Sequence, residues 1–214
     1  LTLQNLGATN PRVVIVGSTS TTPITNVIIR NTVIENGSNS QTSAQGVLVS
    51  SSGGAAGYFN NISIVNNSFV KTYYGVYSTA VSASGNGSGL LIQNNLMNNS
   101  GANSIGYSAV YLLGVDGYEV SGNSIGNIET TANNPTGIYI GSNSINGEIS
   151  KNNISNVAYT GTGGYGGKGI WLLPSNSTAN TVIRNNFISD IKGDGWNTFA
   201  SDAIIGISVA NSGS

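Results

Sequence analysis

Acidic side chains gather at two places in this sequence of 214 residues. Asp190, Asp194 and Asp202 surround Lys192, in a segment that also holds Trp196 and Phe199. Carboxylate oxygens are the ligands that calcium prefers, so the segment is a candidate calcium or catalytic site. The alternative is a solvated loop whose charges keep it soluble, and we favour that interpretation.

Glu119 and Glu148 form the second place. Each precedes an apolar residue of a repeated segment, Val120 or Ile149, so both should point outward from neighbouring strands. Such a pair could hold a cation, but an exposed pair offset by Lys151 is the commoner arrangement. Cleavage of a glycosidic bond needs two carboxyl groups at a defined separation, and the chain has no His. We therefore expect no cofactor, with calcium as the one exception to consider.

The elements that must position these side chains belong to a repeat. A six-residue pattern recurs: an aliphatic residue, two variable residues, Asn, a small or polar residue, and an apolar residue. Its copies span 28–33, 64–69, 91–96, 120–125, 149–154 and 182–187, with the asparagines Asn31, Asn67, Asn94, Asn123, Asn152 and Asn185. Intervals of 27 to 36 residues are typical of solenoids, in which each repeat forms one coil.

Each coil is predicted to contain three short strands. The first has the form small-apolar-x-apolar, and alternation places five of its residues on one face: Val47, Val76, Val110, Ile138 and Ile170. The second strand ends at the repeated Asn, and the third begins at once. We expect the third strand to direct these residues inward: Val33, Phe69, Leu96, Ile125, Ile154 and Phe187.

The repeated Asn leaves no room for a loop between the second and third strands. A bend of one or two residues requires the left-handed backbone conformation, which Asn tolerates better than any residue except Gly. Stacked coils would also let the side-chain amides hydrogen-bond along the column, as Asn ladders do. The pattern predicts an all-β protein: a β-solenoid of about six to seven coils, with an Asn column at the tight turn.

Composition restricts the function classes. Only 7% of the residues are charged and the net charge is −1, so the chain lacks the clustered Lys and Arg of nucleic-acid binding proteins. No apolar run approaches the length of a membrane span, and there is no Cys for disulfides or thiolate metal sites. The repeat runs nearly end to end, which predicts one domain over residues 1–214.

The repeated strings, such as residues 26–31 and 182–188, resemble the coils of right-handed parallel β-helix proteins, the pectate lyase-like superfamily. The resemblance covers most of the chain and implies the fold, not an activity, since the family includes lyases, hydrolases, phage tailspikes and adhesins. In its enzymes the active site lies on the outer face of the first strand. Here that face is expected to carry a small column, Gly46, Gly75, Ala109, Gly137 and Gly169, and a large one, Leu48, Tyr77, Tyr111, Tyr139 and Trp171.

Neither column contains a carboxylate, and the second is largely aromatic. Tyr and Trp rings are surfaces on which sugar rings pack, so Tyr77, Tyr111, Tyr139 and Trp171 are the candidate ligand-binding residues, beside a shallow trough left by the small column. Two other interpretations remain open. A loop could cover the rings, or the rings could stack across strands and stabilise the sheet.

The leading hypothesis is a non-catalytic structural or adhesive segment of a secreted or surface-exposed bacterial protein that contacts glycans. It rests on the resemblance and on a surface of Asn, Ser, Thr and Gly. The alternative is a polysaccharide lyase or glycoside hydrolase whose catalytic groups lie in loops or missing coils. Both ends read as open solenoid edges, so we expect the rest of a longer chain, or a capping partner, to cover them.

Overall fold

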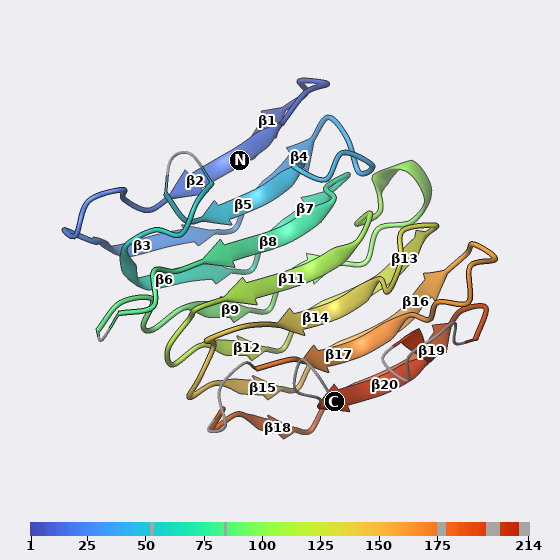
Figure 1. The fold of residues 1–214 in the computed structure, drawn as a ribbon. Helices are drawn as coiled ribbons and strands as arrows, with labels where there is room; N and C mark the ends of the chain where they lie inside the picture. The colour runs from blue at the N-terminus through green and yellow to red at the C-terminus, as the bar shows by residue number, and fades with distance from the viewer. Residues whose placement is uncertain (52–53, 84, 175–178, 196–201, 210–214) are drawn as a thin grey trace.

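The chain folds as a parallel β-solenoid of about six coils (Figure 1). The computed structural model describes residues 1–51, 54–83, 85–174, 179–195 and 202–209. Each coil contributes one strand to each of three sheets, here called sheets I, II and III in the order in which a coil visits them. β1 (Thr2–Asn5) and β20 (Ile205–Val209) lie at opposite ends of the stack (Figure 1). The predicted all-β solenoid is confirmed.

All pairings between the strands are parallel. Sheet I contains β2 (Arg12–Val16), β5 (Gln45–Val49), β8 (Tyr74–Thr79), β11 (Ser108–Leu113), β14 (Thr136–Ile140), β17 (Lys168–Leu172) and β20 (Ile205–Val209). Sheet II contains β3 (Ile24–Arg30), β6 (Phe59–Val65), β9 (Leu91–Gln93), β12 (Glu119–Ser121), β15 (Glu148–Ser150) and β18 (Val182–Arg184). Sheet III contains β1 (Thr2–Asn5), β4 (Val33–Asn36), β7 (Ser68–Val70), β10 (Leu96–Met97), β13 (Ser124–Thr130), β16 (Asn153–Tyr159) and β19 (Phe187–Lys192), and a short 3₁₀ helix, η1 (Gly101–Asn103), follows β10.

The predicted inward column of sheet I is confirmed. Its five residues pair with one another in register across β5, β8, β11, β14 and β17. None of the five side chains has any exposed surface: Val47, Val76, Val110, Ile138 and Ile170. They form one wall of a continuous apolar core along the solenoid axis.

The inward column predicted for sheet III is correct in three coils and wrong in three. Phe69, Ile125 and Ile154 are buried. By contrast, Val33, Leu96 and Phe187 are 36%, 52% and 65% exposed. The strand pairing places the next residue of each of these coils in the core column instead: Ile34, Met97 and Ile188.

The error is a shift of one residue that affects the whole six-residue pattern in those coils. In sheet II the residues in register with Ile64, Val120 and Ile149 are Ile29, Ile92 and Ile183, not Ile28, Leu91 and Val182. Successive side chains of a strand point to opposite faces, so a shift of one residue exchanges inside and outside.

The turn between sheets II and III consists of two residues with different tasks. The first adopts the left-handed conformation, with φ between 53° and 66°, and its members are Asn31, Asn66, Asn94, Gly122, Lys151 and Asn185. The second points its side chain inward, and its members are Thr32, Asn67, Asn95, Asn123, Asn152 and Asn186. The predicted single Asn column is therefore two columns: Asn31, Asn94 and Asn185 bend the chain but do not form the ladder. Conversely, Asn67, Asn123 and Asn152 belong to the ladder but are not left-handed.

The ladder amides satisfy one another from coil to coil. Asn123 Nδ2 donates to Ile92 O and to Asn152 Oδ1, both at 2.9 Å, and the backbone N–H of Asn123 donates to the same Oδ1 at 3.0 Å. Asn95 and Asn152 repeat this arrangement with their own neighbours. Side chains this deeply buried would cost stability if they lacked partners, so the ladder holds successive coils in one register.

Candidate functional site

Four aromatic side chains form a continuous column on the outer face of sheet I, as predicted. Tyr77, Tyr111, Tyr139 and Trp171 are mutual register partners on β8, β11, β14 and β17. Ring centroids are 5.1 Å apart for Tyr77 and Tyr111 and 4.3 Å apart for Tyr111 and Tyr139, with nearly parallel planes. Trp171 meets Tyr139 edge to face at 5.3 Å. All four are half-buried, whereas Leu48, the fifth residue expected here, is fully buried.

A second aromatic group, which the sequence analysis missed, borders this column. Tyr73 and Tyr107 stack at 5.2 Å with an interplanar angle of 4°. Tyr74 lies edge-on between this pair and the column, 5.0 Å from Tyr77 and 5.2 Å from Tyr111. The recurrence of Tyr directly before the small-apolar first strand, at 73–74 and 107, was the available signal. Cross-strand stacking, one of the alternatives left open above, is therefore present.

The predicted trough beside the rings does not exist. The small column points inward: a Cβ on Gly46, Gly137 or Gly169 would lie 2.6–2.8 Å from the side chain of a core residue of sheet III. Each would also approach a backbone carbonyl of the next coil at 2.5–2.7 Å. These glycines are required because two sheets pack closely there, and they leave no groove on the surface.

Burial changes the acidity of the tyrosine hydroxyls. It raises the pKa of Tyr77, Tyr111 and Tyr139, and it raises the pKa of Tyr107 to about 12. Desolvation also raises the pKa of Tyr118, a core residue directly before β12, to about 12, although a hydrogen bond with Thr181 lowers it in part. The hydroxyls of the column are thus protonated at neutral pH and able to donate hydrogen bonds.

These shifts predict a loss of stability in alkaline solution. The unfolded chain releases its tyrosine protons near the ordinary pKa of 10, whereas folded Tyr107 and Tyr118 hold theirs to about 12. The contribution of these groups to the free energy of unfolding is therefore fully present below pH 10 and decreases as the pH rises toward 12. Tyrosinate absorbance and circular dichroism recorded together should show these groups ionising only as the fold is lost. The stability of the Tyr118→Phe variant should decline less steeply with pH. Ionisation of all tyrosines near pH 10 in a folded chain would contradict the raised pKa values.

A buried polar cluster lies beside Trp171 at the same face. Lys168, the first residue of β17, has no exposed surface. Its Nζ donates to Asn134 Oδ1 at 2.7 Å and lies 4.8 Å from the centre of the Trp171 ring. Asn134 Nδ2 donates to Asp202 Oδ1 at 3.2 Å, and Asp202 is only 7% exposed. Lys168 and Asp202 are 34 and 68 positions from Asn134, and no sequence pattern predicts these contacts.

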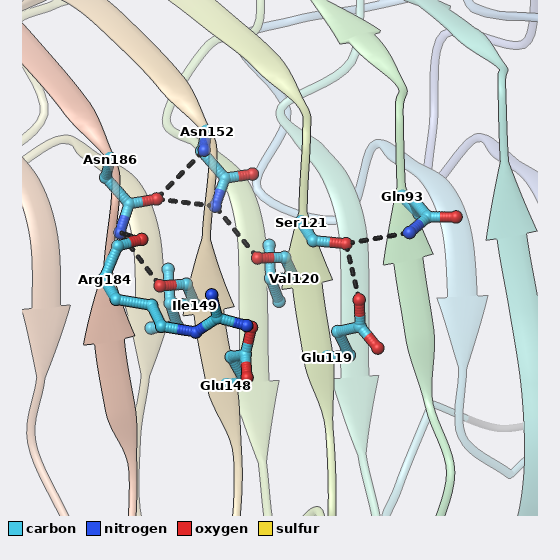
Figure 2. A network of polar contacts seen from close by, with 9 residues as sticks. All are labelled: Gln93, Glu119, Val120, Ser121, Glu148, Ile149, Asn152, Arg184 and Asn186. Atoms are coloured by element: carbon cyan, nitrogen blue, oxygen red, sulfur yellow. Dashed lines mark hydrogen bonds and ion pairs between the residues drawn. The ribbon is translucent and has the colours of Figure 1, made fainter.

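Glu119 and Glu148 lie on neighbouring strands of sheet II, as predicted, but each is engaged by a neighbour (Figure 2). Ser121 Oγ donates to Glu119 Oε1 at 2.7 Å and receives a hydrogen bond from Gln93 at 3.1 Å. Arg184, not Lys151, forms the ion pair with Glu148, at 2.7 Å. A hydrogen bond from Ser150, together with Arg184, lowers the pKa of Glu148. Each of the two carboxylates is thus engaged in contacts with neighbouring surface side chains.

The three acidic residues near the last coil lie in different environments. Asp190 forms an ion pair with Lys192 at 2.9 Å. Asp194 is exposed and accepts a hydrogen bond from the backbone N–H of Gly164 at 3.1 Å, whereas Asp202 belongs to the buried cluster. Trp196 and Phe199, which were expected in the same loop, lie outside the described residues. Within the described ranges, no group of three or more His, Cys, Asp or Glu side chains is placed to hold a metal ion.

In the described part of the chain, no helix has the length and apolar character that crossing a membrane requires. No protein-family model, no curated protein and no solved structure matches the sequence or the fold of this chain.

Proposed function

We propose that this chain is a non-catalytic structural and adhesive segment of a secreted or surface-exposed bacterial protein, and that its aromatic column contacts glycans. The observation that carries the proposal is the column itself: four half-buried rings at one register position in four successive coils. At strand spacing the column extends roughly 15 Å, enough for several sugar units. The sparsely charged surface and the resemblance to β-helix proteins support the location.

The stacked geometry determines how a glycan would be held. The faces of Tyr77, Tyr111 and Tyr139 lie against one another, so a sugar ring cannot stack on them and would meet the partly exposed edges of these half-buried side chains. Phenolic hydroxyls that remain protonated can donate hydrogen bonds to sugar oxygens and accept them from sugar hydroxyls. Recognition would therefore be polar and distributed over several coils.

The placement of Asp202 supports a non-catalytic role for this face. Its carboxylate lies near Lys168 at the end of the aromatic column, but it is almost fully buried and bonded to Asn134. A general acid or base must reach the bond that it cleaves. A glycan lying across Trp171 would not have direct access to this group.

Removing the hydroxyl groups while keeping the rings tests the proposal. The triple variant Tyr77→Phe, Tyr111→Phe, Tyr139→Phe keeps the stack and should melt close to the parent protein. Loss of three hydrogen bonds of about 0.5–1.5 kcal/mol each should weaken glycan binding at least tenfold. Binding is measured on a glycan array and then by calorimetry with the best polysaccharide.

The matched control removes exposed apolar surface from another face. Leu96→Ser combined with Phe187→Ser changes two exposed side chains of sheet III and should leave glycan binding unchanged. Equal losses in both variants would point to nonspecific adhesion. If the parent protein binds no glycan, the aromatic column serves packing alone and the glycan part of the proposal is wrong.

A further inference from the structure

Lys168, Asn134 and Asp202 form a continuous chain of polar contacts that is largely buried. Lys168 Nζ lies 2.7 Å from Asn134 Oδ1 and 3.3 Å from Gly166 O, and Asn134 Nδ2 lies 3.2 Å from Asp202 Oδ1. The Lys168 side chain is completely buried and Asp202 nearly so. The indole nitrogen of Trp171, whose ring covers Lys168, is also buried and has no hydrogen-bond partner among the described residues.

This environment favours a nucleophilic lysine. Desolvation lowers the pKa of Lys168 to about 8, although the charge of Asp202 acts in the opposite direction. A fraction on the order of one tenth is then the neutral amine at pH 7, compared with a negligible fraction for an exposed lysine. A neutral amine lies next to a carboxamide, and a carboxylate accepts a hydrogen bond from the nitrogen of that carboxamide. These are the groups needed for acyl transfer.

We propose that Lys168 and Asn134 form an intramolecular isopeptide bond. The Lys168 amine attacks Asn134 Cγ and forms a new C–N bond. Asp202 accepts the proton that the lysine nitrogen loses and passes it to Asn134 Nδ2. The bond between Cγ and Nδ2 then breaks and ammonia leaves, so that amine and primary amide become one secondary amide and one ammonia. Asp202 ends as the carboxylate with which it began, and no oxidant or cofactor is consumed.

The position of the bond gives it a mechanical consequence. Asn134 lies just before β14, and Lys168 begins β17, the neighbouring strand of sheet I. The link would join two successive coils at the edge where a coil passes from sheet III to sheet I. It would hold these coils together covalently, whereas the other contacts between coils in the described part of the chain are noncovalent.

Intact-mass spectrometry of the purified protein tests the proposal directly. After incubation of the folded chain near neutral pH, its mass should be lower than the sequence mass by one ammonia. Tryptic mapping should show a branched peptide with two amino termini that joins the segment containing Asn134 to the segment containing Lys168. The Lys168→Met variant should have the mass calculated from its own sequence. Asp202→Ala should slow or abolish the loss of ammonia.

Lys192 provides the matched control. Its Nζ lies 2.9 Å from an Asp190 oxygen, but both side chains are exposed, so Lys192→Met should still show the loss of one ammonia. The parent protein alone decides the question even if a variant at Lys168 fails to fold. A folded parent with the full sequence mass, or hydrolysis of Asn134 to Asp without a branched peptide, would overturn the proposal.

Discussion

Replacing Asn95 with Gly is expected to lower the free energy of unfolding by at least about 3 kcal/mol, whereas Asn94→Gly should change it by less than about 1 kcal/mol. The side chain of Asn95 is fully buried and donates to Ile64 O at 2.9 Å and to Asn123 Oδ1 at 3.0 Å. Its Oδ1 accepts two hydrogen bonds from Asn67. Deleting this amide leaves several buried polar groups without partners at once, each costing about 1–3 kcal/mol.

Asn94 is the control because it is the same residue type at the adjacent position. It is exposed and has φ of 53°, a conformation that Gly adopts without strain. The difference in free energy of unfolding is measured by chemical denaturation of the parent and the two variants. The comparison requires that this free energy falls with denaturant at the same slope in all three proteins. If the two variants are equally stable, the buried amides do not hold the coils together and the ladder is incidental to stability.

Phe69→Ala is expected to cost about 3–5 kcal/mol, whereas Phe187→Ala should cost less than about 1 kcal/mol. The Phe69 ring has no exposed surface and packs in the core against sheet I, beside Gly46. Its removal loses the burial of a large side chain and leaves a cavity. Phe187 is 65% exposed, so its truncation removes little buried surface.

Thermal melting monitored by circular dichroism distinguishes the two variants. A large decrease in the melting temperature for Phe69→Ala and a small one for Phe187→Ala are expected. Similar decreases for both would mean that Phe187 is buried in solution, in contradiction to the register of β16 with β19. Phe69→Leu, which refills most of the volume, should recover a large part of the loss.

Of the candidate site, the aromatic column was predictable and the buried cluster was not. Tyr77, Tyr111 and Tyr139 occupy the same place in a short alternating strand, so period-2 reasoning places them on one outer face. Lys168, Asn134 and Asp202 come from three distant segments. Nothing in their local sequence indicates contact, because only the stacking of coils and the path of the returning chain bring them together.

The sequence by itself determined the architecture: a recurring Asn between two apolar positions requires a tight turn and a stack of similar coils. It did not determine the register of three coils. In the first of them the inward turn position is held by Thr32, while Asn31 takes the left-handed bend, and in the other two the critical positions are doubly occupied. Asn94 is followed by Asn95, and Leu96 by Met97, so two alignments one residue apart fit the pattern equally well. The tertiary structure selects between them. Only one alignment lets each buried amide bond to the amide above and below it while Met97 faces the core, and an unsatisfied buried amide would be costly enough to exclude the other.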